Sequence, residues 1–475
     1  DAVMNQPSAV PLATLSWTEP SAASAFAARR ASLARLLPDN WEAPLWLVAG
    51  YSRPRNFPHN RYRFRAESHF LYLIGRHLEG AVLVLSRGEW TLFAKPADPS
   101  DALWTGPVPS LAELSGELGL PVRPLDELPA SSDVVLIPPQ DADTAIWLQE
   151  KLDRDIIASG GDQLEGDAAP LGDALIQLRL RHDAAAISQL RQAAVVTERA
   201  HRAGMAATRP GLRESVIRAA MEQPIIAAGM TTSYNSIVTV HGEVLHNEQH
   251  HHVLGERDLL LADVGAETAE GWAGDVTRSW PVSGRFSGTQ KAIYEVVLAT
   301  EVSAIERVAP GVRYLEVHRH AGRTLLAGLA ALGIVKGDPQ ECYEAGLAGL
   351  FFPHGVGHLL GLDVHDMEDL GDRAGYAPGR SRLPGAGDRF LRLDRDLEPG
   401  MAVTIEPGFY QIPGLTERES AGKLASLVNW DELAKYHDVR GIRIEDDVLV
   451  TEGGREVLTR GIPKSVSEVE AAMQG

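Results

Sequence analysis

The sequence predicts two domains in series, an α/β domain followed by a larger domain of mixed helices and strands. The chain has 475 residues, of which 44% are hydrophobic, so it is long enough for more than one hydrophobic core. Short apolar runs alternate with helix-forming segments over the first third, whereas a long stretch of helical periodicity begins at residue 174. We therefore expect domains at residues 1–173 and 174–475.

The elements of the first domain are short. Residues 21–37 are rich in helix formers and predict a helix, and residues 144–152 predict another. Apolar runs bounded by Gly, Arg or Pro predict strands at residues 45–48, 70–74, 81–85, 90–94 and 133–138. This domain shows no catalytic constellation of its own.

The second domain combines longer helices with strands. Helical periodicity predicts helices at residues 174–202, 212–228, 290–308 and 315–332. Apolar runs predict strands at residues 237–240, 258–263, 271–280, 401–406 and 442–450. Several of these predicted strands contain or end in an acidic residue, which is unusual for a buried segment.

Composition excludes several classes of function. Asp and Glu number 64 against 45 Lys and Arg, and the net charge of −19 repels nucleic acid and anionic membranes. The single cysteine, Cys342, cannot form an internal disulfide, which favours a reducing compartment. No apolar run has the length of a membrane span, and the start lacks a signal-peptide pattern. We therefore expect a cytoplasmic protein.

Three histidines, His354, His358 and His365, lie close together among glycines and branched apolar residues. Gly355 and Gly357 permit a close approach of the backbone, so this stretch can turn sharply and hold an imidazole over a pocket. Alone, such histidines are more often hydrogen-bonded core residues than metal ligands. Acidic residues elsewhere in the chain change this interpretation.

Four carboxylates lie in apolar, strand-like settings: Asp263, Asp275, Glu406 and Glu445. Each could be a surface acid or a helix cap. Burial of the whole set, however, requires positive partners, because an unpaired carboxylate is costly to desolvate. Lysine is scarce nearby, and two divalent cations would balance the four charges. Oxygen ligands with one imidazole suit Mn²⁺, although Co²⁺ or Zn²⁺ could bind the same set.

The order Asp, Asp, His, Glu, Glu resembles the metallopeptidase family that includes aminopeptidase P and prolidase. The contexts that carry the resemblance are Asp263-Val-Gly, Gly274-Asp-Val-Thr-Arg, Gly355-Val-Gly-His, Glu406-Pro-Gly and Arg443-Ile-Glu-Asp-Asp. The segments Glu67-Ser-His-Phe-Leu-Tyr-Leu-Ile-Gly and Leu103-Trp-Thr-Gly resemble the amino-terminal domain of the family. The resemblance covers nearly the whole chain. It implies an α/β amino-terminal domain followed by an α+β catalytic domain of the pita-bread fold.

The resemblance also implies roles for the site residues. Asp275 and Glu445 would bridge two metal ions, Asp263 would bind one ion, and His358 and Glu406 would bind the other. Glu406 would also handle protons around the attacking water, as a carboxylate beside an activated water can. Three further histidines would act on the substrate: His246 at the reacting carbonyl, and His354 and His365 along the pocket. Without the resemblance, each of these three would be interpreted as a structural histidine.

Substrate length is the main open choice. Arg392 lies nine positions before Met401 and resembles the prolidase arginine that binds the free carboxylate of a dipeptide. The alternative is that Arg392 belongs to a solvated charged run. We expect an Xaa-Pro dipeptidase, with aminopeptidase P as the first alternative. A pita-bread binding protein without catalysis and a metal-free, creatine-cleaving relative are disfavoured by the complete ligand set. The family likeness implies a homodimer that acts on small proline-containing peptides.

Overall fold

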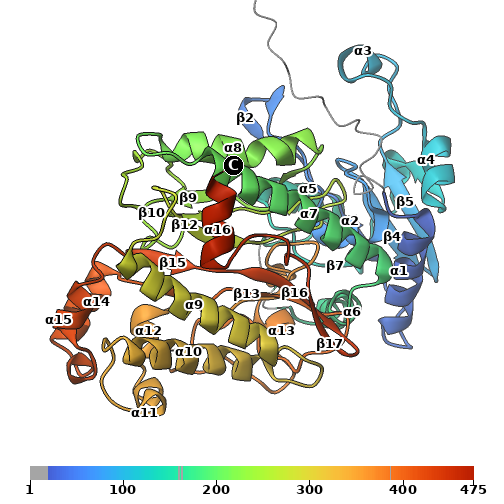
Figure 1. Ribbon diagram of the computed structural model, residues 1–475. Coiled ribbons are helices and arrows are strands. Elements are labelled where there is room, and N and C mark those ends of the chain that lie inside the picture. Colours follow the sequence, from blue (N-terminus) through green and yellow to red (C-terminus); the bar gives the residue numbers. More distant parts are fainter. Residues whose placement is uncertain (1–19, 159–160, 162–163, 386, 475) are drawn as a thin grey trace, which may run out of the picture.

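The computed structural model describes residues 20–158, 161, 164–385 and 387–474 of the chain. In Figure 1 the amino-terminal third, in blue and cyan, lies beside the remainder, which runs from green to red. The first 19 residues of the predicted amino-terminal domain, and residue 475 of the second, lie outside the described residues.

A mixed five-stranded sheet forms the amino-terminal domain, in the order β6-β5-β4-β1-β7. The strands are β1 (Leu45–Val48), β4 (Val82–Ser86), β5 (Glu89–Ala94), β6 (Val122–Pro124) and β7 (Val135–Leu136). The helices are α1 (Ala23–Leu36), α2 (Ser68–Ile74), α4 (Leu111–Leu118) and α5 (Ala142–Leu152). Leu45 and Leu47 belong to one apolar core and Trp46 to another, so the sheet is buried on both faces.

The apolar run at residues 70–74 is a helix, and the predicted strand was wrong. The preceding Glu67 caps α2 by accepting a hydrogen bond from the Phe70 N–H, and the helix ends at Gly75 in a left-handed conformation with φ 70°. All residues of the run are buried, so it has no amphipathic period. A short continuous apolar run fits either structure, and the caps decide between them.

Antiparallel sheets form the centre of the second domain, in the orders β12-β10-β9 and β13-β16-β17, while β14 pairs with β15. The strands are β9 (Ile237–Thr239), β10 (Leu259–Asp263), β12 (Thr277–Pro281), β13 (Ala402–Ile405), β14 (Gly408–Tyr410), β15 (Gly441–Arg443), β16 (Asp446–Thr451) and β17 (Gly454–Val457). The long helices are α7 (Ala184–Ala207), α8 (Glu214–Ala227), α9 (Gly288–Arg307) and α10 (Tyr314–Ala331). In Figure 1, α7 and α8 lie toward the top of this domain and α9 and α10 toward the bottom.

The helical periodicity that begins at residue 174 belongs to two helices, so the single helix predicted at 174–202 was wrong. α6 (Ala168–Arg179) ends before α7 begins, and Asp183 caps α7 by accepting the N–H of Ala186. Both helices keep an apolar face, which is why the period continues across the break. The predicted domain boundary between residues 173 and 174 falls inside α6 and stays a prediction.

Two predicted strands are interrupted at acidic residues. Of the region predicted at 271–280, only residues 277–280 lie in a strand, which is β12, and Asp275 comes two residues before that strand begins. The strand predicted at 442–450 is divided into β15 and β16, with Ile444 and Glu445 between them. These interruptions place both carboxylates at strand ends, where their side chains can turn toward a common site.

The remaining elements are short. They are β2 (Pro54–Phe57), β3 (Asn60–Arg61), α3 (Ala102–Thr105), η3 (Leu125–Glu127), β8 (Thr231–Thr232), β11 (Ala266–Glu267), α11 (Pro339–Glu344), α12 (Ala348–Phe351), η5 (Glu368–Leu370), α13 (Asp372–Gly375), α14 (Pro413–Ser420), η6 (Ala425–Leu427), α15 (Trp430–Ala434) and α16 (Val466–Met473). Among the described residues, no helix combines the length and apolar character that crossing a bilayer requires.

Candidate metal centre

Strand pairing brings the four carboxylates of the predicted site together. Asp263 ends β10 and pairs with Thr277 of β12, two residues after Asp275. Glu445 lies between β15 and β16, and its N–H donates to the Thr277 carbonyl at 3.0 Å. Glu406 directly follows β13, which pairs with β16. Four residues that are far apart in the sequence therefore meet at neighbouring strand ends.

A glycine-containing turn brings His358 to the same place. The Thr404 N–H donates to the His358 carbonyl at 3.0 Å, and the Glu406 N–H donates to the Val356 carbonyl at 2.7 Å. A Cβ on Gly357 would overlap the Thr404 carbonyl, so this close approach to β13 requires glycine. The backbone of β13 thus fixes the position of the histidine relative to Glu406.

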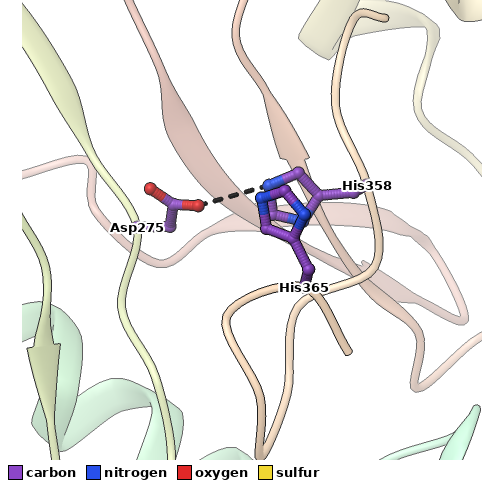
Figure 2. A group of neighbouring side chains, drawn as sticks. All are labelled: Asp275, His358 and His365. Atoms are coloured by element: carbon purple, nitrogen blue, oxygen red, sulfur yellow. Dashed lines mark ion pairs between the residues drawn. The ribbon is translucent and has the colours of Figure 1, made fainter. Parts of the chain in front are cut away.

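The five predicted metal-binding residues form two overlapping groups of possible ligands. One group contains Asp263, Asp275 and Glu445, the other contains His358, Glu406 and Glu445, and the candidate ligand atoms within each lie within 4.8 Å of one another. His358 Nε2 is 3.2 Å from Asp275 Oδ2, as Figure 2 shows, and 3.4 Å from Glu406 Oε1. Glu445 belongs to both groups, and Asp275 reaches from the first group to His358 of the second.

The charges of this cluster are not balanced by protein cations. Asp275 and Glu445 are 5% and 1% exposed. Burial raises the pKa of Asp275 to about 8, with Asp263 adding to the effect, and it raises the pKa of Glu445 well above its usual range. Among the described residues, Arg443 is the one Lys or Arg that forms an ion pair with any of the four carboxylates, and its Nη2 is 2.8 Å from Asp263 Oδ2. Four clustered carboxylates with a single arginine paired to one of them fit divalent metal ions.

Hydrogen bonds leave suitable ligand atoms directed at the cluster. His358 Nδ1 is 2.9 Å from the Leu359 carbonyl, to which it can only donate, so Nε2 keeps its lone pair for a metal. The Thr277 hydroxyl donates to Glu445 Oε2 at 2.7 Å, and the Thr404 hydroxyl donates to Glu406 Oε1 at 3.2 Å. These bonds orient both carboxylates and still leave each with a second oxygen.

A buried chain of polar groups, which the sequence did not reveal, connects His354 to the metal-binding cluster. His354 Nδ1 donates to the Gly355 carbonyl at 2.8 Å, so its Nε2 accepts from the Tyr410 hydroxyl at 2.8 Å. That hydroxyl accepts from Arg443 Nη1 at 3.0 Å, and Arg443 in turn binds Asp263. Burial and the charge of Arg443 together lower the pKa of His354 to about 3, so this histidine is neutral. Both of its ring nitrogens are already bonded within the protein.

The candidate substrate residues border one cavity of about 670 Å³ next to the carboxylates. It is lined by all of the predicted site residues: His246, Asp263, Asp275, His354, His358, His365, Arg392, Glu406 and Glu445. The ring of His365 lies against that of His358, with centroids 3.8 Å apart and planes tilted by 30°, and both rings lie on the same side of Asp275 in Figure 2. His246 is exposed at the edge of the cavity, and partial desolvation there lowers its pKa. The cavity therefore places three additional imidazoles and an arginine beside the possible metal ligands.

Glu368 and Tyr234 also belong to the site, although the sequence did not point to either of them. One oxygen of Glu368, Oε2, is 3.1 Å from His365 Nδ1 and 2.8 Å from Arg392 Nη1. Burial alone would raise the pKa of Glu368, but the hydrogen bond and charge of His365 and the charge of Arg392 lower it to about 2. Tyr234 donates its hydroxyl proton to Asp263 Oδ1. Neither residue stands in a distinctive sequence context; the spacing of Glu368, three residues after His365, was the one available signal.

Comparison with known proteins places the chain in a family. Residues 188–452 match metallopeptidase family M24, and residues 26–136 match the aminopeptidase P amino-terminal domain. The Xaa-Pro dipeptidase of Homo sapiens is 32% identical over 428 residues, which are 87% of this chain and 85% of that protein. A probable Xaa-Pro aminopeptidase of Coccidioides posadasii is 31% identical over 429 residues, 86% of this chain and 88% of that protein.

Solved structures of two aminopeptidases have the same overall fold as this chain. Aminopeptidase PepP of Pseudomonas aeruginosa has 31% identity and a TM-score of 0.76, and the match covers 96% of this chain and 98% of that one. Aminopeptidase P from E. coli with the inhibitor Pro-Leu has 28% identity and a TM-score of 0.77, with 96% and 99% covered. The fold is therefore confirmed as an amino-terminal α/β domain followed by an α+β pita-bread domain.

The fold and the matches define a class: the chain belongs to metallopeptidase family M24, in the branch that carries an aminopeptidase P amino-terminal domain. The predicted aminopeptidase P/prolidase membership is thus confirmed, and the protein is an enzyme of the metallopeptidase class. Membership implies divalent metal ions as cofactors, in a dinuclear arrangement. The donor set described above fits that requirement.

Proposed function

We propose that the protein hydrolyses the bond between an amino-terminal residue and proline, using two divalent metal ions, and that dipeptides are its principal substrates. The observation that carries this proposal is the convergence of His358 and four carboxylates, of which Asp275 and Glu445 are buried, beside a cavity that Arg392 also lines. Matched relatives include Xaa-Pro dipeptidases and Xaa-Pro aminopeptidases, which support the same bond specificity. A guanidinium is a suitable partner for the free carboxylate of a dipeptide.

We assign the metal-binding roles as follows. Asp275 and Glu445 would be shared by the two ions, Asp263 would hold one ion, and His358 and Glu406 would hold the other. Support comes from the geometry, since Glu445 is shared by both ligand groups and Asp275 approaches both Asp263 and His358. The ligands are mainly oxygen with one imidazole, so we propose Mn²⁺ as the metal, with Co²⁺ or Zn²⁺ as substitutes.

The reaction needs a proton acceptor and hydrogen-bond donors. When bound, the two cations would polarise the scissile carbonyl and lower the pKa of a water molecule. Glu406 is oriented by the Thr404 hydroxyl and is the candidate to take the proton from that water and deliver it to the leaving nitrogen. The nitrogen of proline has no N–H in the substrate, so it must be protonated to leave. His246 and His365 are the candidate hydrogen-bond donors to the substrate. His354 lines the same cavity as an uncharged side chain.

A second candidate function is supported by one observation. Arg392 is paired with Glu368, which reduces its attraction for a free carboxylate. An Xaa-Pro aminopeptidase, which removes the first residue from longer peptides, needs no such attraction. A binding protein without catalysis is disfavoured, because the five metal-binding positions are all present and close together.

We also propose a cytoplasmic homodimer that acts on small proline-containing peptides and binds neither nucleic acid nor membranes. The net charge of −19 supports the last two points. Trp104 and Leu103 on α3 are 83% and 82% exposed, and α3 stands out from the body of the protein in Figure 1. Large exposed apolar side chains on a protrusion support contact with a second copy. Light scattering of the purified protein tests this arrangement.

The proposed activity is tested by comparing Xaa-Pro dipeptides with Xaa-Pro-Yaa tripeptides. Hydrolysis of both, with a larger kcat/KM for the dipeptide, is the expected result. Arg392→Ala should raise the KM of the dipeptide selectively, because only the dipeptide places a free carboxylate beside this side chain. If the metal-loaded protein cleaves neither substrate, the proposed function is wrong.

A further inference from the structure

One carboxylate oxygen connects two groups at the wall of the cavity. Glu368 Oε2 is 2.8 Å from Arg392 Nη1 and 3.1 Å from His365 Nδ1. Among the described residues, Arg392 makes no other hydrogen bond or ion pair. Glu368 and Arg392 both line a smaller cavity of about 120 Å³, and Arg392 also lines the substrate cavity. The arginine that lines the substrate cavity therefore carries a negative charge in direct contact with its guanidinium.

The backbone around Glu368 is held firmly. Met367 is buried and adopts φ 59°, a left-handed conformation that is uncommon for a residue with a side chain. Arg179 Nη2 donates to Asp366 Oδ1 at 2.7 Å, and Asp369 Oδ2 is 2.8 Å from His69 Nε2. Both flanks of Glu368 are thus fixed by buried contacts. The Glu368 side chain is 37% exposed, and it is presented by a turn whose neighbouring residues are anchored in the core.

The other two arginines that border the cavity are also paired. Arg382 Nε lies within 3.0 Å of both carboxylate oxygens of Asp372, and Arg443 binds Asp263. The described wall of the cavity therefore has no arginine with an unopposed positive charge. A free carboxylate that binds at Arg392 must approach Glu368 as well as the guanidinium.

This arrangement affects charged and neutral substrates differently. The carboxylate of a dipeptide follows proline directly, so at Arg392 it meets attraction from one group and repulsion from the other. In a longer peptide or a peptide amide, the corresponding group is a neutral amide, which can accept a hydrogen bond from Arg392 without repulsion from Glu368. A like charge placed behind the binding group reduces discrimination in favour of the charged ligand.

We propose that Glu368 is a specificity-determining residue that offsets the charge of Arg392 and so allows substrates extended beyond proline to compete with dipeptides. The inference rests on the proposed function, because it concerns the length of the same Xaa-Pro substrates. It differs from a purely structural role for Glu368, which would affect charged and neutral substrates equally.

The test uses three substrates with the same first residue: an Xaa-Pro dipeptide, the corresponding Xaa-Pro amide and an Xaa-Pro-Yaa tripeptide. Glu368→Gln keeps an oxygen acceptor for Arg392 and His365 but removes the charge. The ratio of kcat/KM for the dipeptide to that for the amide should rise about tenfold in this variant, mainly through a lower KM for the dipeptide. The ratio of dipeptide to tripeptide should rise in the same direction.

The matched control is Glu398→Gln. Glu398 is half-exposed and pairs with Arg181 at 2.6 Å, outside the substrate cavity, so its substitution removes the same charge from the chain. The substrate ratios of this variant should equal those of the wild type. Glu368→Ala is a second variant, expected to shift the ratios in the same direction as Glu368→Gln.

The outcomes separate the two proposals. If the wild type cleaves the peptides but Glu368→Gln leaves the ratios unchanged, or lowers all three rates together, Glu368 does not determine specificity. A fall in the dipeptide ratio would show that Glu368 holds Arg392 in place for the carboxylate, which also overturns the inference. If the wild type cleaves none of the three, the proposed function itself fails, and the inference fails with it.

Discussion

Two adjacent residues, Glu445 and Asp446, are both buried but have opposite electrostatic surroundings. Asp446 is 2.8 Å from Arg278 Nη2 and 2.6 Å from Lys464 Nζ, and these cations hold its pKa below the usual range despite its burial. Glu445 faces other carboxylates instead, and its pKa is raised. The charge of Asp446 is thus neutralised by an arginine and a lysine of the protein itself. The carboxylates around Glu445 require bound metal cations for the same purpose, and this need is the physical basis for the metal centre.

The largest expected effect is the loss of activity when Glu445, in the metal-binding cluster, is substituted. Glu445→Gln keeps the size of the side chain but removes a charge shared by both ligand groups. We expect the variant to lose bound metal and more than about a hundredfold in kcat/KM, since even indirect ligand changes can cost that much. Its unfolding in the metal-free form should be no easier than that of the wild type, because a repulsive charge has been removed. Retention of full activity would contradict the assigned role.

Substitution of the neighbouring Asp446 should lower stability but leave metal binding unchanged. Asp446→Asn leaves the buried side chain of Arg278 without its charged partner, and we expect a loss of about 3–5 kcal/mol in the free energy of unfolding. Metal content per folded chain should be retained. Denaturant unfolding and metal analysis of the same sample check both points, with Glu398→Gln as an exposed control that leaves stability unchanged. Equal effects of Glu445→Gln and Asp446→Asn on stability would remove the distinction between the two clusters.

The pH dependence of stability should differ between metal-free and metal-loaded protein. In the metal-free fold, burial raises the pKa of Asp275 from 3.8 to about 8, so the folded state binds this proton more tightly than the unfolded state. The metal-free protein should therefore lose stability as pH rises from 3.8 to about 8. Bound metal offsets the charge and should weaken this trend. Thermal unfolding with and without a chelator at several pH values measures the difference, and parallel curves would be the contrary result.

A smaller effect is expected at the polar chain beside the metal centre. Tyr410→Phe removes the hydroxyl that donates to His354 and accepts from Arg443, while keeping the aromatic ring. We expect kcat to fall about tenfold, the size typical of a group that orients residues at a metal site. KM should change little, because the ring still fills its place. Steady-state kinetics with a dipeptide separate the two parameters, and a change confined to KM would assign the hydroxyl to substrate binding.

Much of the fold could be predicted because local signals agreed with the final structure. The strand at residues 45–48 was predicted with its observed bounds, and the helices at 290–308 and 315–332 differ from α9 and α10 by one or two residues at their ends. The strand predicted at residues 70–74 failed because a fully buried run has no period. The helix at 174–202 failed because apolar spacing continued past the cap at Asp183.

The candidate site was only partly accessible from the sequence. The carboxylates and His358 could be selected because each has a distinctive local context, and the structure brings them together. Tyr410 could not be selected, since an aromatic residue in a strand is usually a core residue. Glu368 looked like an ordinary surface acid. Its importance depends on Arg392, which lies 24 positions away in the chain, and such a contact has no local signature.

The most direct test of the central claim is the metal content of the purified protein, measured together with its activity on an Xaa-Pro dipeptide before and after chelation. We predict two divalent metal ions per active chain, loss of activity when they are removed, and recovery when Mn²⁺ is restored. A metal-free protein that cleaves the dipeptide at the full rate would contradict the account.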